Sequence, residues 1–449
     1  MHLVSLLSGR IVGSSGTSNP QIRFGEDLMS RVSYVMMNPD GRAAMTNAVR
    51  EAINGLIGKV CDEGGVDRRD IHDMVFVANP IMHHLFLGID PTELGQAPFA
   101  LAVSGALQYW AADIGIEAGR GARLYTLPCI AGHVGADAAG ATLSEGPHRQ
   151  DKMMLLVDVG TNAEIVLGNS HRVVAASSPT GPAFEGAEIS SGQRAAPGAI
   201  ERVRIDPVTL EPRYRVIGVD KWSDEDGFED AAAGVGVTGI CGSAIIEVVA
   251  EMYLAGIISE DGVVDGTMAE RSPRIIPNGR TFSYLLRDGE PRITVTQNDI
   301  RAIQLAKAAL YAGIKLLMEK QGVEKVDMIR FAGAFGSFID PKYAMVLGLI
   351  PDCDLDEVKA VGNAAGTGAL MALLNRDHRR EIEATVKKIE KIETALEPHF
   401  QQIFVNAMAM PNKVDSFPEL ARIVALPERK VITPGGEDGG GRRRRRERG

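Results

Sequence analysis

The sequence has few cysteines, and they form no recognisable pattern. Four cysteines stand in 449 residues, at Cys61, Cys129, Cys241 and Cys353, with no C-x-x-C pair and no regular disulfide spacing. This scarcity predicts a reduced, cytoplasmic setting. The sequence also shows no iron–sulfur or zinc motif, since both depend on closely spaced cysteines.

Long apolar runs are missing as well. No stretch approaches the roughly 18 apolar residues that a membrane-spanning helix needs. The first residues lack the basic-then-apolar pattern of a secretory signal peptide. We therefore expect no membrane segment and no membrane partner.

Positive charge is scarce outside the last few residues. The net charge is −10, and the +5 of Arg442–Arg448 leaves −15 on residues 1–441. A body this acidic binds nucleic acid poorly, so we expect no nucleic-acid partner. Residues 431–449, which include GGEDGGGRRRRRERG, are of low complexity and are expected to be disordered. The alternative interpretation of this tail is a weak anchor for an acidic partner.

Glycine, by contrast, is abundant. It makes up 50 of 449 residues, or about 11%, against about 7% in average proteins. Much of the excess lies in short turns between apolar strands, which is typical of a backbone that approaches a ligand closely. The length allows two or more domains.

The most informative stretch is Leu155–Ser177, which reads LLVDVGTNAEIVLGNSHRVVAAS. Its pattern predicts a β-meander whose first strand ends on Asp158. Such a meander can bind phosphate, because Gly160 leaves backbone N–H groups accessible and Thr161 and Asn162 add side-chain donors. The Asp158 carboxylate could hold a metal ion there. The alternative is an ordinary turn at the end of a strand.

The first residues, His2–Thr17, repeat this meander without its opening strand and loop. Two meanders about 150 residues apart, each followed by helices, predict two related halves around a cleft. Alternating strands and helices predict an α/β fold, in which ligands bind beyond the carboxyl ends of strands. Three glycine-rich loops are expected at such ends: Asp158–Asn162, Gly333–Ser337 and Gly362–Gly368.

Periodicity and end signals predict the smaller elements. Thr296 and Asp299 resemble a capping box at the start of a long helix. We predict strands at Met74–Ala78, Leu124–Ile130 and Val326–Phe331, helices at Gly41–Ile57, Ile240–Ala255, Thr296–Lys320 and Glu381–Leu396, and at Val361–Leu374 a turn that becomes a helix.

Together these motifs resemble those of one ATPase family. Duplicated ribonuclease-H-like halves with phosphate loops on β-meanders are the architecture of actin, sugar kinases and heat-shock chaperones. Within that superfamily, residues 2 to about 430 closely resemble the ATPase part of the reductive activators of corrinoid proteins. The matching segments are NPQIRFGEDLMSRV (19–32), NPIMHHLFLGIDP (79–91), LPCIAGHVGADAAGA (127–141), LLVDVGTNAEIVLG (155–168), SPTGPAFEGAEISSGQRAAPGAIE (178–201), GICGSAIIEVVAEMYLAGII (239–258), FAGAFGSFIDP (331–341) and GNAAGTGAL (362–370).

The resemblance implies two actin-like ATPase halves around a cleft, the first half lacking its opening strand. It implies that residues 1–147 form the first half, or middle region of the family, and that residues 148–430 form the second half, or C-terminal ATPase region. Full-length relatives begin with a 2Fe-2S domain of C-x4-C-x2-C spacing and carry a first Asp-x-Gly-Thr loop. Neither is present here, so we expect a chain truncated at its N-terminus and without the cluster.

The resemblance also implies a function. Such activators bind a corrinoid protein of a methyltransferase system whose cobalt has reached the inactive Co(II) state. They pass it one electron, with ATP and Mg²⁺, and so restore the Co(I) form; a homodimer is compatible with this role. Two other interpretations stay open: a small-molecule kinase of the same superfamily, and a nucleotide-independent module that binds the corrinoid protein.

Asp158 is expected to hold Mg²⁺, with Asp137 as a second metal-binding or water-positioning carboxylate. For Glu164, structural and functional interpretations are equally supported. The alternatives are a surface position for Asp137, a tight turn for the second glycine loop and close helix packing for the third. The expected catalytic and nucleotide-binding residues are Asp158, Asp137, Gly160, Thr161, Asn162, Gly333, Ala334, Phe335, Gly336, Gly362, Asn363 and Gly366.

Overall fold

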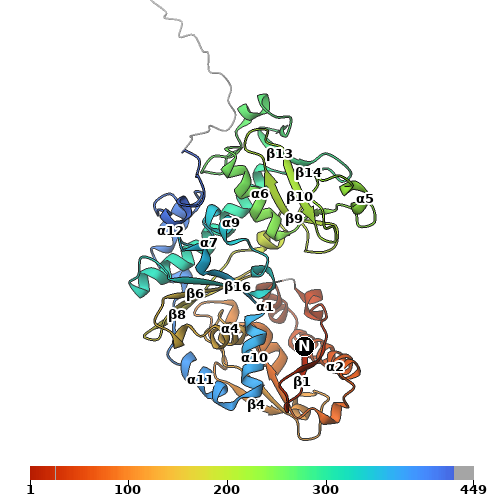
Figure 1. The fold of residues 1–449 in the computed structure, drawn as a ribbon. Coiled ribbons are helices and arrows are strands. Elements are labelled where there is room, and N and C mark those ends of the chain that lie inside the picture. The colour runs from red at the N-terminus through yellow and green to blue at the C-terminus, as the bar shows by residue number, and fades with distance from the viewer. Residues whose placement is uncertain (26, 429–449) are drawn as a thin grey trace, which may run out of the picture. The chain divides into compact units, whose positions relative to one another are not determined.

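The computed structural model describes residues 1–25 and 27–428, whose elements are drawn in Figure 1. They gather in two compact units. Unit 1 comprises Met1–Gly181, Ala309–Pro341 and Ile350–Phe404, and unit 2 comprises Pro182–Ala308, Lys342–Leu349 and the segment from Val405 on. Each unit combines distant parts of the sequence, so the expected division after residue 147 stays a prediction. The tail at 431–449 lies outside the described residues.

A six-stranded sheet forms the centre of unit 1, and its order is β16-β15-β6-β7-β8-β17. The predicted meander is confirmed as β6, β7 and β8. β6 pairs antiparallel with β7 and parallel with β15. Its apolar residues are buried, as expected of a central strand covered on both faces. The bounds are β6 Met154–Val159, β7 Ala163–Gly168, β8 Val173–Ser178, β15 Met328–Ala332, β16 Val358–Gly362 and β17 Glu390–Lys391.

Helices α4 and α10 pack against one face of this sheet. Ala138 of α4 packs with Leu156 and Val166 of the sheet, while the other side of α4 packs with β5 and α11. A Cβ on Gly368 would overlap the carbonyl oxygen of Gly140, so the backbones of α4 and α10 are in direct contact. The bounds are α4 Ala136–Glu145, α8 Gly333–Gly336, α10 Ala364–Leu374 and α11 Arg376–Val386.

Two smaller sheets complete unit 1. β1 and β2 form an antiparallel hairpin, and β3, β5 and β4 form a three-stranded sheet with β3 at its edge. Neither β1 nor β3 has a second ladder partner within the described part of the chain. The bounds are β1 His2–Val4, β2 Ile11–Ser14, β3 Asp73–Phe76, β4 Leu107–Trp110, β5 Arg123–Thr126, α1 Leu28–Met37, α2 Gly41–Gly64 and α3 Pro80–Leu87.

Unit 2 contains two three-stranded sheets, ordered β10-β9-β11 and β12-β13-β14, among its described residues. Helices α7, α9 and α12 contribute residues to both units. No described helix is both long enough and apolar enough to cross a bilayer. The bounds are β9 Ala199–Ile205, β10 Pro212–Val216, β11 Gly239–Ile240, β12 Ile275–Asn278, β13 Thr281–Arg287, β14 Ile293–Val295, α5 Phe228–Ala232, α6 Gly242–Leu254, α7 Gln297–Gln321, α9 Pro341–Leu347, α12 Phe400–Ala407 and α13 Pro418–Ala421.

The α/β class is confirmed, and so is the capping box of α7, in which the Thr296 N–H donates to Asp299 Oδ2 at 2.7 Å. The helix predicted at Glu381–Leu396 is confirmed only as far as Val386, and its predicted bounds are wrong. Helix α11 begins at Arg376, where the Asn375 side chain accepts a hydrogen bond from the Asp377 N–H, and it ends at Val386. The chain then forms β17 along the edge of the six-stranded sheet.

Other boundaries differ by a few residues. The strand predicted at Met74–Ala78 ends at Phe76, and the one predicted at Leu124–Ile130 ends at Thr126. The helix that begins at Gly41 continues to Gly64. At Val361–Leu374 the sequence predicted a turn and a helix, but the first two residues complete β16. An apolar run alone does not show where a strand leaves its sheet.

Candidate functional site

Asp158 and Glu164 lie opposite each other on one face of the six-stranded sheet. The antiparallel register pairs Asp158 of β6 directly with Glu164 of β7. Side chains alternate between faces along a strand, so Asp158 shares its face with Leu156, and Glu164 shares its face with Val166. Leu156 and Val166 pack with residues of α4. Both carboxylates therefore face the layer that contains α4.

Helix α4 brings Asp137 to the same place. Asp137 lies in the first turn of α4, and its Oδ1 accepts a hydrogen bond from the Ala138 N–H at 2.9 Å. Together with Asp158 and Glu164 it lines a pocket of about 340 Å³ in unit 1. The described residues that line this pocket are Asn19, Asp27, Leu28, Arg31, Asn79, Met82, Asp137, Asp158, Gly160, Thr161, Asn162 and Glu164. We call it the acidic pocket.

The electrostatics of the acidic pocket disfavour its own negative charge. Burial raises the pKa of Glu164 well above its usual range, and the charges of Asp137 and Asp158 add to that effect. Burial also raises the pKa of Asp137 to about 6, with Asp158 acting in the same direction. The pKa of Asp158 is raised by burial as well. Such shifts are typical of functional sites, and a cation bound here would favour the charged forms of these carboxylates.

The carboxylates do not form a complete metal site by themselves. Within residues 1–25 and 27–428, no group of three or more His, Cys, Asp or Glu side chains is arranged to hold a metal ion. Mg²⁺ usually keeps several waters and binds through one or two carboxylates plus substrate phosphates. The acidic pocket fits that mode of binding, in which phosphate completes the coordination, better than it fits an ion held by protein alone.

Hydrogen bonds from Thr180 and Gly181, which follow β8, hold the loop at Gly160–Asn162 in place. Thr180 Oγ1 donates to the Gly160 carbonyl at 2.7 Å, and the Gly181 N–H donates to the Thr161 carbonyl at 2.9 Å. Thr180 is buried. These bonds fix the carbonyl groups of Gly160 and Thr161 and so hold the loop in place at the rim of the acidic pocket.

In the second glycine loop, Gly333–Ser337, Gly333 lies beside Asp158 of the acidic pocket. Gly333 has φ +83°, and a Cβ there would overlap Asp158 Oδ1, so only glycine fits beside the carboxylate. Gly333 and Gly336 form the ends of α8, which also contains Ala334 and Phe335. The expected contact of this loop with a nucleobase or ribose stays a prediction.

The third glycine loop lies elsewhere. Asn363 caps α10, where its Oδ1 accepts a hydrogen bond from the Gly366 N–H at 2.8 Å. Asn363 and Gly366 line a different and larger cavity of unit 1, and neither lines the acidic pocket. Gly362, at φ +64°, ends β16 beside Ser337. Asn363 and Gly366 therefore lie outside the acidic pocket, while Gly362 lies opposite Ala332, which in turn pairs with Asp158. Their expected part in nucleotide binding stays a prediction.

Several other residues that line the acidic pocket were not predicted from the sequence. Asn19, Asp27 and Arg31 come from the NPQIRFGEDLMSRV segment, and Asn79 and Met82 come from NPIMHHLFLGIDP. Both segments carried the family resemblance, and that was the available signal. The asparagines are also helix caps, since Asn19 accepts from the Gln21 N–H and Asn79 accepts from the Met82 N–H.

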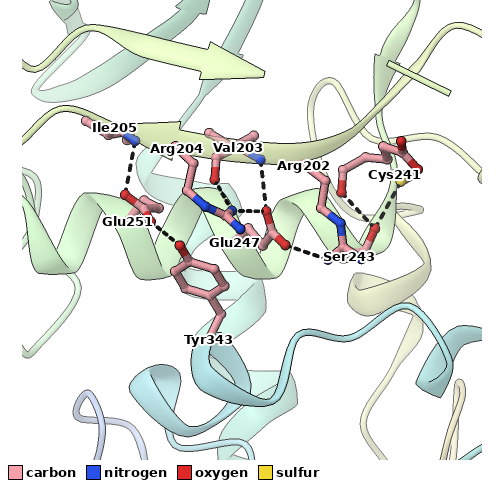
Figure 2. A network of polar contacts seen from close by, with 10 residues as sticks. Arg202, Val203, Arg204, Ile205, Cys241, Ser243, Glu247, Glu251 and Tyr343 are labelled. Atoms are coloured by element: carbon pink, nitrogen blue, oxygen red, sulfur yellow. Dashed lines mark hydrogen bonds and ion pairs between the residues drawn. The ribbon is translucent and has the colours of Figure 1, made fainter. Parts of the chain in front are cut away.

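Unit 2 contains a second group of buried carboxylates, shown in Figure 2, which is arranged differently. Glu247 is completely buried and accepts hydrogen bonds from Arg202 and Arg204, both at 2.6 Å. It also accepts one from the Val203 N–H. Glu251 accepts from the Ile205 N–H at 3.0 Å, and the Tyr343 hydroxyl donates to it. Both carboxylates of this group accept hydrogen bonds from several donors, which indicates a structural role.

Comparisons with known proteins agree with this geometry. Residues 152–421 match a family model described as the C-terminal domain of RACo, the ASKHA domain, and residues 1–150 match the RACo middle region. The chain is 33% identical over 416 residues to the corrinoid activation enzyme RamQ of Eubacterium limosum, covering 90% of this chain and 67% of that protein. It is 28% identical over 274 residues to a [Co(II) methylated amine-specific corrinoid protein] reductase of Methanosarcina barkeri, covering 58% and 46%.

A solved structure supports the same assignment. The reductive activator for corrinoid,iron-sulfur protein superposes with a TM-score of 0.77 at 34% identity, covering 92% of this chain and 64% of that chain. The chain thus spans between about half and two thirds of the length of these relatives. The expected actin-like ATPase fold is confirmed. The chain belongs to the RACo family of reductive activators, of which it carries the middle region and the C-terminal ASKHA domain.

Proposed function

We propose that this chain is the ATPase part of a reductive activator that restores a Co(II) corrinoid protein of a methyltransferase system to its Co(I) form. The observation that carries the proposal is the acidic pocket, where Asp137, Asp158 and Glu164 converge beside the Gly160–Asn162 loop. One relative is named a corrinoid activation enzyme, another a reductase of a Co(II) corrinoid protein, and the solved relative a reductive activator for corrinoid,iron-sulfur protein.

In this proposal, different residues bind the phosphates of the nucleotide, the metal ion and the waters around it. Backbone N–H groups at Gly160 and Thr161 contact phosphate oxygens, while Asp158 orients the metal ion from the end of β6. Asp137 and Glu164 position waters around it. Mg²⁺, when bound, would offset the negative charge of the phosphates and of the carboxylates together. Arg31 also lines the pocket.

Reduction of Co(II) to Co(I) consumes one electron, which this part of the chain does not supply. Its four cysteines are all buried and unpaired, and they are far apart in sequence. In the proposal the electron comes from a separate one-electron donor. The role of this chain is then to couple ATP binding to the state in which the corrinoid protein accepts that electron.

Equilibrium binding of ATP with Mg²⁺ to the full chain tests the proposal. We expect saturable binding by calorimetry, weaker than that of a full-length relative. Asp158→Asn should weaken it by at least tenfold, because it removes the carboxylate nearest the loop. Glu319→Gln is the matched control, since Glu319 is an exposed acid on α7, and it should leave the affinity within twofold.

Two results would contradict the proposal. One is the absence of ATP binding together with retained binding of a corrinoid protein, which is the behaviour of a nucleotide-independent module. The other is ATP-dependent phosphorylation of a small molecule, which is the behaviour of a kinase.

A further inference from the structure

The acidic pocket of unit 1 has one basic side chain, Arg31, among the described residues that line it. The same lining carries four carboxylates, from Asp27, Asp137, Asp158 and Glu164. A guanidinium group keeps its charge in proteins, so the pocket holds one fixed positive charge beside these acids. This mixture of charges suits a ligand that itself combines both signs, such as a phosphate chain with its divalent cation.

Contacts at the start of α1 fix the position of Arg31. Asp27 caps the helix, and its Oδ1 accepts a hydrogen bond from the Ser30 N–H at 2.6 Å. Arg31 Nε donates to the Gly25 carbonyl at 3.0 Å. A Cβ on Gly25 would lie 2.8 Å from the backbone nitrogen of Arg31, so the chain before α1 packs closely on the first turn of the helix. These contacts hold the Arg31 side chain in place at the pocket.

Burial makes the charge of Arg31 costly. Arg31 is only 5% exposed, and burial lowers its pKa, while the charge of Asp27 acts in the opposite direction. Asp27 is exposed, so water screens its attraction for the guanidinium group. A buried guanidinium group is best stabilised when its fork of N–H donors meets charged oxygens. A phosphate group in the pocket would offer it two parallel hydrogen bonds.

The size and lining of the acidic pocket indicate which part of a nucleotide it takes. Its volume is about 340 Å³, near the lower end of the roughly 300–1,000 Å³ that ligand pockets span. None of the described residues that line it is aromatic, so no ring is available there to stack on a base. The pocket therefore suits the phosphate end of the nucleotide. A terminal phosphate carries more negative charge than an inner one, so it gains most from a guanidinium group.

We propose that Arg31 binds the terminal phosphate of the nucleotide and thereby makes the acidic pocket select ATP over ADP. This inference rests on the proposed function and deepens it, because it names the residue that distinguishes the two nucleotides. Mg²⁺ offsets part of the phosphate charge, and the guanidinium group of Arg31 offsets part of the remainder. ADP lacks the third phosphate and leaves Arg31 without this partner. The difference between ATP and ADP is thus sensed at α1.

Calorimetric titration of the full chain with ATP and with ADP, each with excess Mg²⁺, tests this assignment. The parent is expected to bind ATP about tenfold more tightly than ADP. Arg31→Gln should weaken ATP binding about tenfold and leave ADP binding within about twofold, because only ATP loses a charged partner. Arg31→Lys should give an intermediate ATP affinity, since an ammonium group keeps the charge but cannot form the bidentate contact.

Arg23→Gln is the matched control. Arg23 is exposed on the same segment, its guanidinium group lies over the Phe24 ring, and it is not among the described residues that line the acidic pocket. The ratio of ATP to ADP affinity should not change in this variant. Inorganic tripolyphosphate and pyrophosphate, each with Mg²⁺, repeat the comparison without a base, and Arg31→Gln should reduce the preference for the longer chain by the same factor. A cooperative thermal transition without ligand shows that each variant is folded.

Three outcomes would overturn the inference. The first is equal weakening of ATP and ADP binding by Arg31→Gln, which indicates that Arg31 shapes the pocket and does not recognise the terminal phosphate. The second is unchanged binding of both nucleotides by that variant. In these two cases the parent still binds ATP, so the proposed function stands. The third is a parent chain that binds neither nucleotide, which overturns the proposed function together with this inference.

Discussion

The acidic pocket of unit 1 and the Glu247–Glu251 group of unit 2 use the same chemical group in opposite ways. Around Glu247, two arginines and a backbone N–H satisfy the carboxylate. In the acidic pocket, burial raises the pKa of Asp137, Asp158 and Glu164. The charges of neighbouring carboxylates raise the pKa values of Asp137 and Glu164 further. Removing one partner of a buried ion pair is costly because it leaves an uncompensated charge, whereas crowding of like charges raises the pKa of each carboxyl group. Under the proposed function, the crowded group is the one that a bound cation would stabilise.

The largest expected effect is the loss of stability when the paired carboxylate of Glu247 is removed. Glu247→Ala leaves Arg202, Arg204 and the Val203 N–H without their shared acceptor. Removal of one partner from a buried ion pair typically costs about 3–5 kcal/mol, and we expect about 3 here because both arginines are about one-third exposed. Urea denaturation measures the loss. A loss below about 1 kcal/mol would show that the network is dispensable.

The next largest effect is expected when a side chain is added beside Asp158 in the acidic pocket. Gly333→Ala forces a left-handed residue to carry a Cβ that overlaps Asp158 Oδ1. We expect a loss of about 2–3 kcal/mol, of which about 1–2 comes from backbone conformation alone. Gly279→Ala is the control, since Gly279 has φ +61° and no neighbouring atoms. If the two variants lose the same stability, Gly333 does not press on the carboxylate.

A smaller effect of opposite sign is expected when the crowding is relieved. Asp158→Asn removes one of two like charges that lie directly opposite each other across β6 and β7. Without metal or nucleotide, at pH 8, the variant should be more stable than the parent by up to about 1 kcal/mol. Glu319→Gln should be neutral in the same denaturation experiment. Destabilisation by Asp158→Asn would mean that its carboxylate has an unrecognised donor.

The smallest effect is the pH dependence of that gain. Burial raises the pKa of Asp137 to about 6, above an unfolded value of about 3.9. The stability that its protonation provides is fully present below about pH 4 and is lost as pH rises through about 6. The gain from Asp158→Asn should therefore shrink between pH 8 and pH 5, because a protonated Asp137 no longer repels Asp158. A gain that is constant over this range would contradict the coupling.

Much of the acidic pocket could be predicted from the sequence, but only for residues whose position follows from the pattern within a single strand and its turn. The meander, its turn and Asp158 follow from local alternation and glycine placement. Glu164 was left open, although a three-residue turn between Val159 and Ala163 is enough to place it opposite Asp158. The side of the pocket formed by Arg31 could not be predicted, because its position depends on how α1 packs and no periodicity within α1 encodes that.

The close contact between α4 and α10 has a mechanical consequence. Gly140 lies one turn beyond Asp137 on α4, while Gly368 lies on α10 among residues that line the larger cavity of unit 1. Flexible side chains normally absorb small displacements between helices, but here main chain meets main chain. At this contact no side chain separates α10 from α4, the helix whose first turn carries Asp137, so the spacing of the two helices is fixed by their main chains.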